Sequence, residues 1–259
     1  MEETPFFSVL MCSQSIDHYF REAVESILNQ SYKNFEFIIV ANGDRQSLSN
    51  SFSRLGYVDP RIRFECTSIK QLAFNLNFGI NLARGHYIVR MDADDIALPD
   101  RLEKLYEHCN ANLVDVIGSS AAIIDTDGHE IGMLTTPLSN EKIRALLTFK
   151  NPYIHPTTAI RRDTLLKVGG YLSQSIGEDY DLWLVLARDP DIIFKNIPDS
   201  LLKYRYHPGQ TKMRLSSCAY SCSLRYREFL VHPSFKKFIS AFLYFFYFWM
   251  MRSLGKIRR

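Results

Sequence analysis

Three carboxylates follow an apolar stretch in the segment Tyr87–Asp95, which has the sequence YIVRMDADD. In an extended chain, side chains two residues apart point to the same side, so we expect Asp92 and Asp94 to share a face and Asp95 to turn elsewhere. Two carboxylates held this close repel each other unless a cation or hydrogen-bond donors compensate. Their oxygens are hard ligands that suit Mg²⁺ or Mn²⁺, and such an ion keeps positions open for phosphate oxygens. The segment therefore suggests a diphosphate site at the end of a strand.

Two other interpretations of this segment involve no phosphate. An acid before the helical pattern that opens at Pro99 and Asp100 is an ordinary helix cap, so the segment could be a surface turn. A calcium loop that starts at Asp92 needs glycine at its sixth position, where Ala97 stands, and it would contain Pro99. The surface turn remains open as an alternative, whereas the calcium loop fits poorly.

A second acidic pair, Glu178 and Asp179, follows Gly177 and opens a helical pattern that Trp183 would anchor in the core. Acids in the first turn of a helix favour its dipole, and this is the structural explanation for the pair. A carboxylate fixed there could instead act as a general base that removes a proton from an attacking hydroxyl. Because the dipole alone would lower its pKa, apolar or acidic neighbours would have to oppose that effect.

A single histidine, His207, follows a short strand pattern at residues 204–206. Lone histidines are more often structural, but a neutral His207 could complete a metal site if the chain folds back over the sheet. Asp125 and Asp127 lie at the predicted hairpin turn Asp127-Gly128, and we interpret them as turn residues rather than metal ligands.

The elements that must position these residues alternate between strands and helices. Strands are predicted at 8–11, 35–40, 62–64, 87–91 and 114–117, with helical patterns between them, the first capped by Ser15 and a later one by Ser139. This alternation predicts an α/β fold with a mostly parallel central sheet flanked by helices. In such sheets ligands bind beyond the carboxyl ends of the strands, where Asp92 and Asp94 stand.

The length and composition indicate one folded domain with an appendage. The chain has 259 residues, of which 46% are hydrophobic and 23% charged, as in globular proteins. Its five cysteines are scattered without a Cys-x-x-Cys spacing, so we expect buried thiols in a reducing compartment rather than disulfides or a zinc site. Met1 is followed by two glutamates and no long apolar run, so no secretory signal is expected.

The charge is distributed unevenly along the chain. Residues 203–259 contain 12 Lys or Arg and the single acid Glu228, a net charge of +11, whereas the first 202 residues contain 19 bases and 27 acids, a net charge of −8. Residues 238–251 are uncharged and rich in aromatic side chains. As a helix this run spans about 21 Å, short of the roughly 30 Å hydrocarbon core, and bases flank both ends. We expect it to lie in an anionic membrane interface rather than on nucleic acid, with a core helix or an oligomer contact as the alternative.

Taken together, these segments resemble the bacterial family 2 glycosyltransferases, inverting enzymes of the GT-A fold that use nucleotide-diphospho-sugars. The resemblance runs roughly from residue 5 to 213. The segments that carry it occur in the same order along the chain: 8–11, 26–32, 35–40, 59–63, 79–85, 90–95, 98–102, 151–152, 155–157, 168–171, 178–184 and 204–207. It implies a catalytic domain over 1–213 and a basic, aromatic, membrane-associating helical tail over 214–259.

The resemblance also implies roles for individual residues. Asp92 and Asp94 match the Asp-x-Asp motif that holds Mn²⁺ or Mg²⁺ on the diphosphate and touches the ribose, and Asp95 adjoins it. Asp179 matches the usual catalytic base, with Glu178 as the neighbouring candidate. His207 matches a position that can reach the metal or diphosphate.

Further expectations concern the substrates. His155 is expected near the acceptor. Two segments of the nucleoside pocket depart from the family pattern, since Ala41-Asn42 replaces a pair of acids and Ile69-Lys70-Gln71 replaces an Asn-x-Gly. Asn42 is kept as a candidate contact to the nucleotide, and UDP-sugar is the family default.

The resemblance thus implies a metal-dependent hexosyl- or N-acetylhexosaminyltransferase for a glycan or lipid-linked acceptor in surface polysaccharide biosynthesis. It is expected to be cytoplasmic and peripheral on the inner membrane. A membrane-docked nucleotide-sugar-binding subunit without turnover is the alternative, and the retained acids Asp92, Asp94, Glu178 and Asp179 argue against it.

Overall fold

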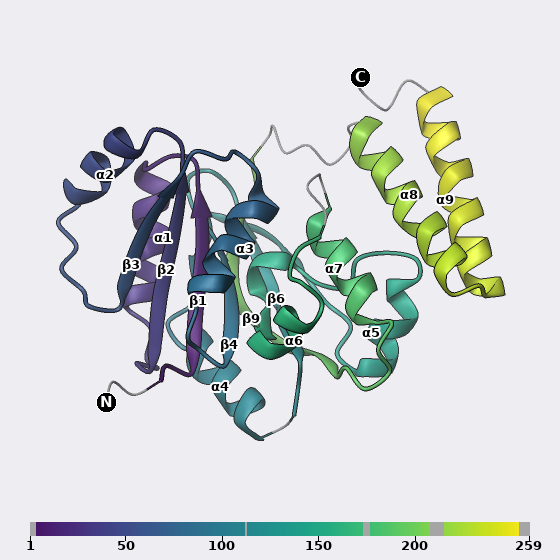
Figure 1. Cartoon of the computed structure of the whole chain (residues 1–259), viewed down its shortest axis with the longest axis horizontal. Coiled ribbons are helices and arrows are strands. Elements are labelled where there is room, and N and C mark those ends of the chain that lie inside the picture. Colours follow the sequence, from purple (N-terminus) through teal and green to yellow (C-terminus); the bar gives the residue numbers. More distant parts are fainter. Residues whose placement is uncertain (1–3, 112, 173–176, 208–214, 254–259) are drawn as a thin grey trace.

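A single nine-stranded sheet organises the part of the chain that the computed structural model describes, residues 4–111, 113–172, 177–207 and 215–253. The strands are β1 (Phe7–Ser13), β2 (Phe35–Asn42), β3 (Ile62–Thr67), β4 (Tyr87–Asp92), β5 (Ile96–Ala97), β6 (Val116–Ile124), β7 (Glu130–Leu134), β8 (Ala159–Arg161) and β9 (Phe194–Arg205). The helices are α1 (His18–Leu28), α2 (Arg45–Ser53), α3 (Leu72–Leu82), α4 (Arg101–Ala111), α5 (Asn140–Leu147), the 3₁₀ turn η1 (His155–Thr157), α6 (Arg162–Lys167), α7 (Glu178–Leu186), α8 (Leu215–Val231) and α9 (Phe235–Ser253). Figure 1 shows helices on both faces of this sheet.

The strand order is β3-β2-β1-β4-β8-β6-β9-β5, with β7 paired to β6. The first four strands in this order are parallel, β6 and β9 are parallel, and the short strand β8 joins the two halves with antiparallel ladders. The predicted α/β class with a mostly parallel central sheet is confirmed. The order reverses between β1 and β4, which is the place where open α/β sheets form a crevice for ligands.

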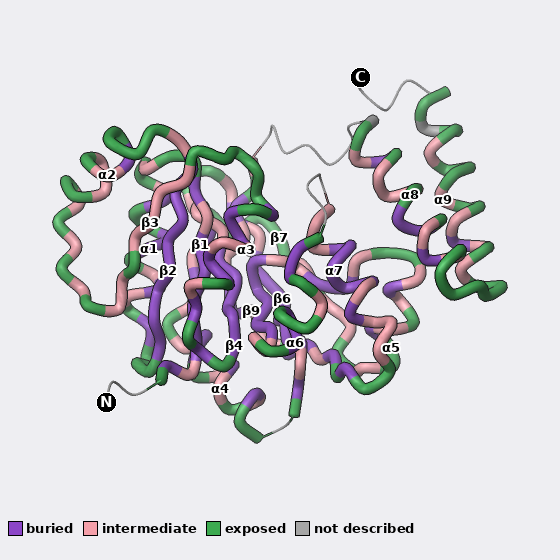
Figure 2. Tube along the Cα trace, in the orientation of Figure 1, coloured by how far each residue is buried: buried purple, intermediate pink, exposed green. Residues whose placement is uncertain are grey.

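Alternate side chains of the central strands pack into two hydrophobic cores, one on each face of the sheet. Val9 and Met11 face the core formed with α1 and α4. Leu10 between them faces the other core, formed with α3, α5, α6, α7 and α8. Strands buried on both faces in this way have continuous apolar sequences, and Figure 2 shows the resulting buried band through β1, β2 and β4.

Most local predictions along the chain are confirmed, with one exception. The hairpin of β6 and β7 turns at Asp127-Gly128, and Ser139 caps α5. The predicted capping of the first helix by Ser15 is wrong, because Asp17 accepts the hydrogen bond from the Phe20 amide at 3.0 Å. Ser15 instead donates to the Asp17 carboxylate at 2.9 Å, since a carboxylate is the stronger acceptor for the first turn.

Gly85, just before β4, lies where the chain approaches β1 too closely for a side chain. A Cβ atom there would lie 2.6 Å from the Ser8 amide nitrogen and 2.7 Å from the Phe7 carbonyl carbon, and these backbone atoms cannot rotate away. We therefore expect Gly85→Ala to lower the free energy of unfolding by about 1–3 kcal/mol, measured by urea denaturation. Gly132→Ala, which would meet only Ile123 at an ordinary 3.4 Å, is the control, and equal losses for both would contradict the explanation.

The C-terminal helices α8 and α9 pack side by side as a hairpin at the opposite end of the molecule from the N-terminus (Figure 1). α8 joins the core through the buried Leu224, whereas α9 exposes most of its aromatic side chains. Among the described helices, none is long and apolar enough to cross a membrane. Three of the predicted flanking bases, Lys256, Arg258 and Arg259, and the N-terminal Met1 lie outside the described residues.

Candidate functional site

Polar side chains follow the carboxyl ends of the parallel strands β4, β1 and β2. Asp92, the last residue of β4, pairs in register with Cys12 of β1, and Asn42 ends β2 two strands away. Asn42 is buried and lies in register with Thr67 at the end of β3. Polar residues therefore lie at the carboxyl ends of the strands next to the β1–β4 reversal, where the sequence predicted that a ligand would bind.

The three predicted carboxylates come together. One oxygen from each of Asp92, Asp94 and Asp95 lies within 4.8 Å of the others. Asp92 and Asp94 are both about one-third exposed, as expected for residues on an open face, but the reason differs from the prediction. β4 ends at Asp92, and a turn at Ala93 and Asp94, rather than strand alternation, returns Asp94 to the same side.

Asp95 has a different environment and is only 1% exposed. Its Oδ1 accepts a hydrogen bond from the Arg205 amide at 2.8 Å, and the Arg205 Nε donates to the Asp94 carbonyl at 2.8 Å. These bonds fasten the end of β9 against the acidic turn. As a result, the ring of His207 reaches the site, with its Nε2 3.0 Å from Asp94 Oδ2.

Burial and mutual repulsion change the protonation of these acids. Burial, and next the Asp92 charge, raise the pKa of Asp94, while the nearby His207 partly offsets this. Burial, together with the charges of Asp92 and Asp94, raises the pKa of Asp95 well above its usual value. Asp92 pairs with a permanently charged group, since the Arg90 guanidinium lies 2.5 Å from its Oδ1. Asp94 and Asp95 thus ionise less readily than free carboxyl groups do.

Asp179 lines the same cleft as Asp92 and Glu178 does not, although both belong to the acidic pair at the start of α7. Gly177 precedes it with a left-handed φ of 92°, a conformation that lets the chain turn into the helix. Asn151 Nδ2 donates to Asp179 Oδ2 at 2.6 Å and fixes that carboxylate. Asp179 and Asp92 line one cleft of about 480 Å³, together with His155 and Tyr204.

The pKa values of the pair are raised in spite of the helix dipole. Burial raises the pKa of Asp179, against hydrogen bonds from the Tyr180 amide and Asn151, and the charge of Asp92 adds to the rise. Burial, followed by the charge of Asp179, raises the pKa of Glu178 to about 7. The opposition that we expected from buried and acidic surroundings is therefore present.

Glu178 gives the folding stability a pH dependence that can be measured. Its folded pKa of about 7 exceeds the ordinary 4.5, so its contribution is fully present below pH 4.5 and is lost as the pH rises through 7. We expect Glu178→Gln to match the wild type near pH 4.5 and to be about 1–3 kcal/mol more stable at pH 8, by urea denaturation in EDTA. Glu107→Gln, on the exposed face of α4, is the control. A loss of stability at pH 8 on Glu178→Gln replacement would contradict this account.

His155 faces the cleft from η1. Its Nε2 lies 2.8 Å from the Tyr171 hydroxyl, and burial, together with the Arg90 charge, lowers its pKa well below the usual value. His155 is therefore neutral and can exchange hydrogen bonds without adding charge beside Asp179.

The residues of the acidic turn fit a divalent cation. The donor set consists of carboxylate oxygens with one imidazole, which suits Mg²⁺ or Mn²⁺. A cation bound between Asp92 and Asp94 would relieve the repulsion that raises the pKa values of Asp94 and Asp95. His207 offers its Nε2 on the Asp94 side of the same group.

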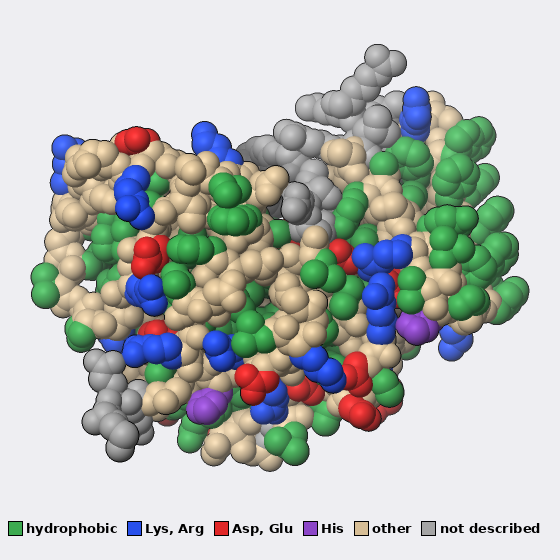
Figure 3. Space-filling view, viewed as in Figure 1, with side chains coloured by type: hydrophobic (Ala, Val, Ile, Leu, Met, Phe, Trp, Pro, Cys, Tyr) green, Lys and Arg blue, Asp and Glu red, His purple; other side chains and the backbone are tan. Residues whose placement is uncertain are grey.

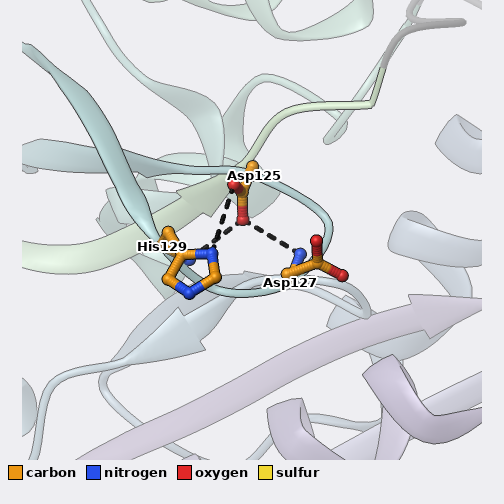
Figure 4. A group of neighbouring side chains, drawn as sticks. All are labelled: Asp125, Asp127 and His129. Atoms are coloured by element: carbon orange, nitrogen blue, oxygen red, sulfur yellow. Dashed lines mark hydrogen bonds and ion pairs between the residues drawn. The ribbon is translucent and has the colours of Figure 1, made fainter.

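A second acidic group lies on the exposed hairpin between β6 and β7 (Figure 4). There the Asp125 Oδ1 accepts hydrogen bonds from the Asp127 and His129 amides, both at 2.9 Å. The Asp125 side chain thus closes the turn, and this agrees with the interpretation of Asp125 as a turn residue.

Three residues of the site were not found from the sequence. Arg90 is 3% exposed and pairs with Asp92, Arg101 links the Arg90 and Pro156 carbonyls, and Asn151 holds Asp179. A charged residue inside the apolar strand pattern of β4 was a usable signal for Arg90, because a buried charge needs a partner. Asn151 belongs to the segment 151–152 that carries the resemblance, but the resemblance assigned it no role.

The expectation of buried thiols is confirmed for two of the five cysteines. All five are free; Cys109 and Cys218 are buried and the other three are half-buried. Burial raises the pKa of Cys12, beside Asp92, to about 12, so this thiol stays protonated.

Comparisons with known proteins found a matching family model and several similar proteins. The family model described as "Glycosyl transferase family 2" matches residues 8–170. The chain is 37% identical over 241 residues to the O-antigen biosynthesis glycosyltransferase WbnJ of Escherichia coli, covering 92% of this chain and 94% of that protein. It is 31% identical over 187 residues to the amylovoran biosynthesis glycosyltransferase AmsE of Erwinia amylovora, covering 71% and 69%.

Solved structures share the fold at low sequence identity. The structure of S. aureus TarS residues 1–349 has a TM-score of 0.65 at 15% identity, covering 86% of this chain and 65% of that one. The mannosyltransferase PcManGT of Pyrobaculum calidifontis, in complex with GDP-Man and Mn²⁺, has a TM-score of 0.65 at 14% identity, covering 87% and 64%. The chain thus spans about two thirds of the length of these structural neighbours.

Proposed function

We propose that this chain, which belongs to glycosyl transferase family 2, moves a sugar from a nucleotide-diphospho-sugar to a glycan or lipid-linked acceptor during assembly of a bacterial surface polysaccharide. The observation that carries the proposal is that Asp92 and Asp179, 87 residues apart in the chain, line one cleft. The names of the relatives WbnJ and AmsE support the class of product.

The donor side of the proposed site is the acidic turn. Asp92 and Asp94 would hold a divalent cation with its diphosphate, and His207 would complete the set. That cation would stabilise the negative charge that develops on the departing diphosphate. Arg90 holds Asp92 in place through an ion pair, and Asp95 keeps the end of β9 fastened to the turn.

The acceptor side is Asp179. Its carboxylate would accept the proton of the acceptor hydroxyl while that oxygen forms a bond to the anomeric carbon. The bond from this carbon to the diphosphate oxygen breaks in the same step, and the electron pair leaves with the nucleoside diphosphate. Attack from the side opposite to the leaving group inverts the configuration. Asn151 holds the carboxylate in position for this transfer, and Glu178 beside it is the second candidate for the base.

The remaining cleft would receive the acceptor glycan. His155, Tyr204 and Lys150 line it with a neutral imidazole, a phenol ring and an ammonium group. Aromatic faces and fixed hydrogen-bonding groups of this kind suit a sugar ring.

The nucleotide and sugar can be identified with one screen. We infer UDP-sugar as the donor, with Asn42 near the nucleoside; because neighbours of this fold bind either UDP-GlcNAc or GDP-Man, both nucleotides must be tested. A thermal-shift screen of UDP-, GDP- and dTDP-sugars, each with Mn²⁺ and with EDTA, tests the donor and the metal together. A donor that stabilises the protein equally in EDTA would contradict metal dependence. The absence of any stabilising nucleotide sugar would contradict the function.

The C-terminal hairpin would bring the enzyme to a lipid-linked acceptor. We infer a catalytic domain over 1–213 and a membrane-associating tail over 214–259, on the cytoplasmic face of the inner membrane. Aromatic side chains of α9 such as Phe242, Phe245 and Trp249 are more than half exposed, and Lys236, Lys237 and Arg252 accompany them. Exposed aromatic rings with bases and no acid on the same helix suit an anionic lipid surface.

This placement gives a direct prediction. We expect Phe245→Asp/Trp249→Asp to reduce flotation with phosphatidylglycerol vesicles at least about tenfold, because two exposed rings leave the interface and two negative charges replace them. Ile131→Asp/Met133→Asp, on the exposed hairpin strand β7, is the matched control. Equal flotation of wild type and the Phe245/Trp249 variant would contradict membrane binding through α9.

A further inference from the structure

A small recess lies where the C-terminal hairpin meets the body of the molecule, away from the catalytic cleft. It has a volume of about 130 Å³ and lies between α5, α7, α8 and α9. Since a single water needs roughly 10–15 Å³ measured in this way, the recess has room for a small ion. The charged side chains that line it are Arg144, Arg188, Arg225, Glu228 and Lys237.

The positive charges in this recess are poorly neutralised. Glu228 is the only carboxylate among the lining residues, and both Arg188 and Arg227 bind it, at 2.6 and 2.9 Å. Arg144 donates to backbone carbonyls at the end of α7. Arg225, which is 6% exposed, donates to the Ser221 and Phe149 carbonyls. Carbonyl oxygens carry no net charge, so the recess keeps an excess of positive charge.

Lys237 has no such structural role. It is half-buried at the start of α9, and within the described part of the chain its ammonium group has neither a hydrogen-bond nor an ion-pair partner. The arginines could be explained as braces that hold α8 and α9 against the body. That explanation gives no role to Lys237, which lines the recess together with three guanidinium groups.

The hairpin that closes the recess also carries an exposed apolar surface. Phe238, the residue after Lys237, lines an apolar groove of about 430 Å³ between α8 and α9, together with Tyr226, Phe242 and Phe245. In Figure 3, Lys and Arg side chains gather between the hydrophobic hairpin and the rest of the molecule. One hairpin thus carries both a cationic recess and an apolar groove, the two features that match a ligand whose anionic group is attached to a hydrocarbon chain.

We propose that this recess binds a phosphate group through Lys237, Arg188 and Arg225. Guanidinium and ammonium groups together are the usual phosphate donors, and a phosphate would supply the missing negative charge. The phosphate can belong to a membrane lipid or be free in solution. The site does not touch Asp92, Asp94 or Asp179, so the proposal stands or fails independently of the transferase reaction.

Adjacent lysines of α9 give a matched test. Lys237→Gln removes the lining charge, Lys236→Gln removes an exposed charge of the same helix that does not line the recess, and Lys237→Arg restores the lining charge. One arm measures binding of sodium pyrophosphate by calorimetry in EDTA. The other measures flotation with phosphatidylglycerol–phosphatidylcholine vesicles against pure phosphatidylcholine vesicles.

We expect Lys237→Gln to weaken binding of pyrophosphate or of the anionic vesicles about five- to tenfold relative to Lys236→Gln. Lys237→Arg should bind about as well as the wild type. A difference confined to pyrophosphate would assign the site to free phosphate. A difference in the anionic vesicles, with or without one in pyrophosphate, would assign it to a lipid headgroup. Equal behaviour of Lys237→Gln and Lys236→Gln in both arms would overturn the proposal, because both remove one charge from the same helix.

Discussion

Replacement of Asp179 by Asn is expected to lower kcat for sugar transfer by about 10²–10⁴-fold while the donor still binds. The amide keeps the size of the carboxylate and can still contact Asn151, so the cleft should keep its shape. It cannot accept a proton from the acceptor hydroxyl, so only the chemical step suffers. Steady-state kinetics together with calorimetric titration of the donor would separate the two effects, and we expect the donor Kd to change less than about threefold.

The neighbouring acid provides the control for this prediction. Glu178→Gln should cost less than Asp179→Asn, because Asp179 and not Glu178 lines the cleft with Asp92. A large loss for Glu178→Gln with a mild effect of Asp179→Asn would make Glu178 the base, and its pKa of about 7 would suit that role near neutral pH. Full activity of both variants would exclude this pair from the chemistry.

Replacement of Asp94 by Ala is the second change with a large expected effect. It removes one of the two partly exposed carboxylates of the acidic turn and the partner of His207. We expect kcat/KM to fall about 10²–10³-fold and the Mn²⁺-dependent thermal shift with donor to disappear, because several kcal/mol of charge stabilisation depend on the bound cation. The measurement is transfer activity against Mn²⁺ concentration.

The acidic group on the exposed hairpin between β6 and β7 provides the control for the Asp94 variant. Asp127 lies in the exposed turn with Asp125 and His129, where the Asp125 side chain only closes the hairpin. Asp127→Ala should therefore leave the metal dependence of transfer unchanged. Proton competition provides a second check on Asp94. Because burial and the Asp92 charge raise the pKa of Asp94, wild-type affinity for Mn²⁺ should fall as the pH is lowered toward that pKa. Metal affinity independent of both Asp94 and pH would place the cation elsewhere.

Much of this protein could be predicted from short stretches of the chain. The alternation of strands and helices and the hairpin at Asp127-Gly128 rest on local features and were identified correctly. Asp92 and Asp94 do lie together, but through a turn and not through strand alternation. Local patterns suffice there because side-chain periodicity and turn chemistry depend on neighbours a few residues away. The prediction that Ser15 caps the first helix was wrong because Asp17, only two residues further along the chain, is a second possible cap and accepts the hydrogen bond instead.

The partnerships within the site depend instead on contacts between distant segments. His207 meets Asp94 across 113 residues, and this requires the long strand β9 to pair with β5 and β6. Asn151 reaches Asp179 only because η1 and α7 pack beside the end of β4. The burial of Arg90 and the raised pKa of Glu178 likewise depend on how the layers of the fold pack around these residues. The chain thus specifies locally which groups are available for chemistry, while the long-range packing of the sheet decides which of them meet and how strongly they ionise.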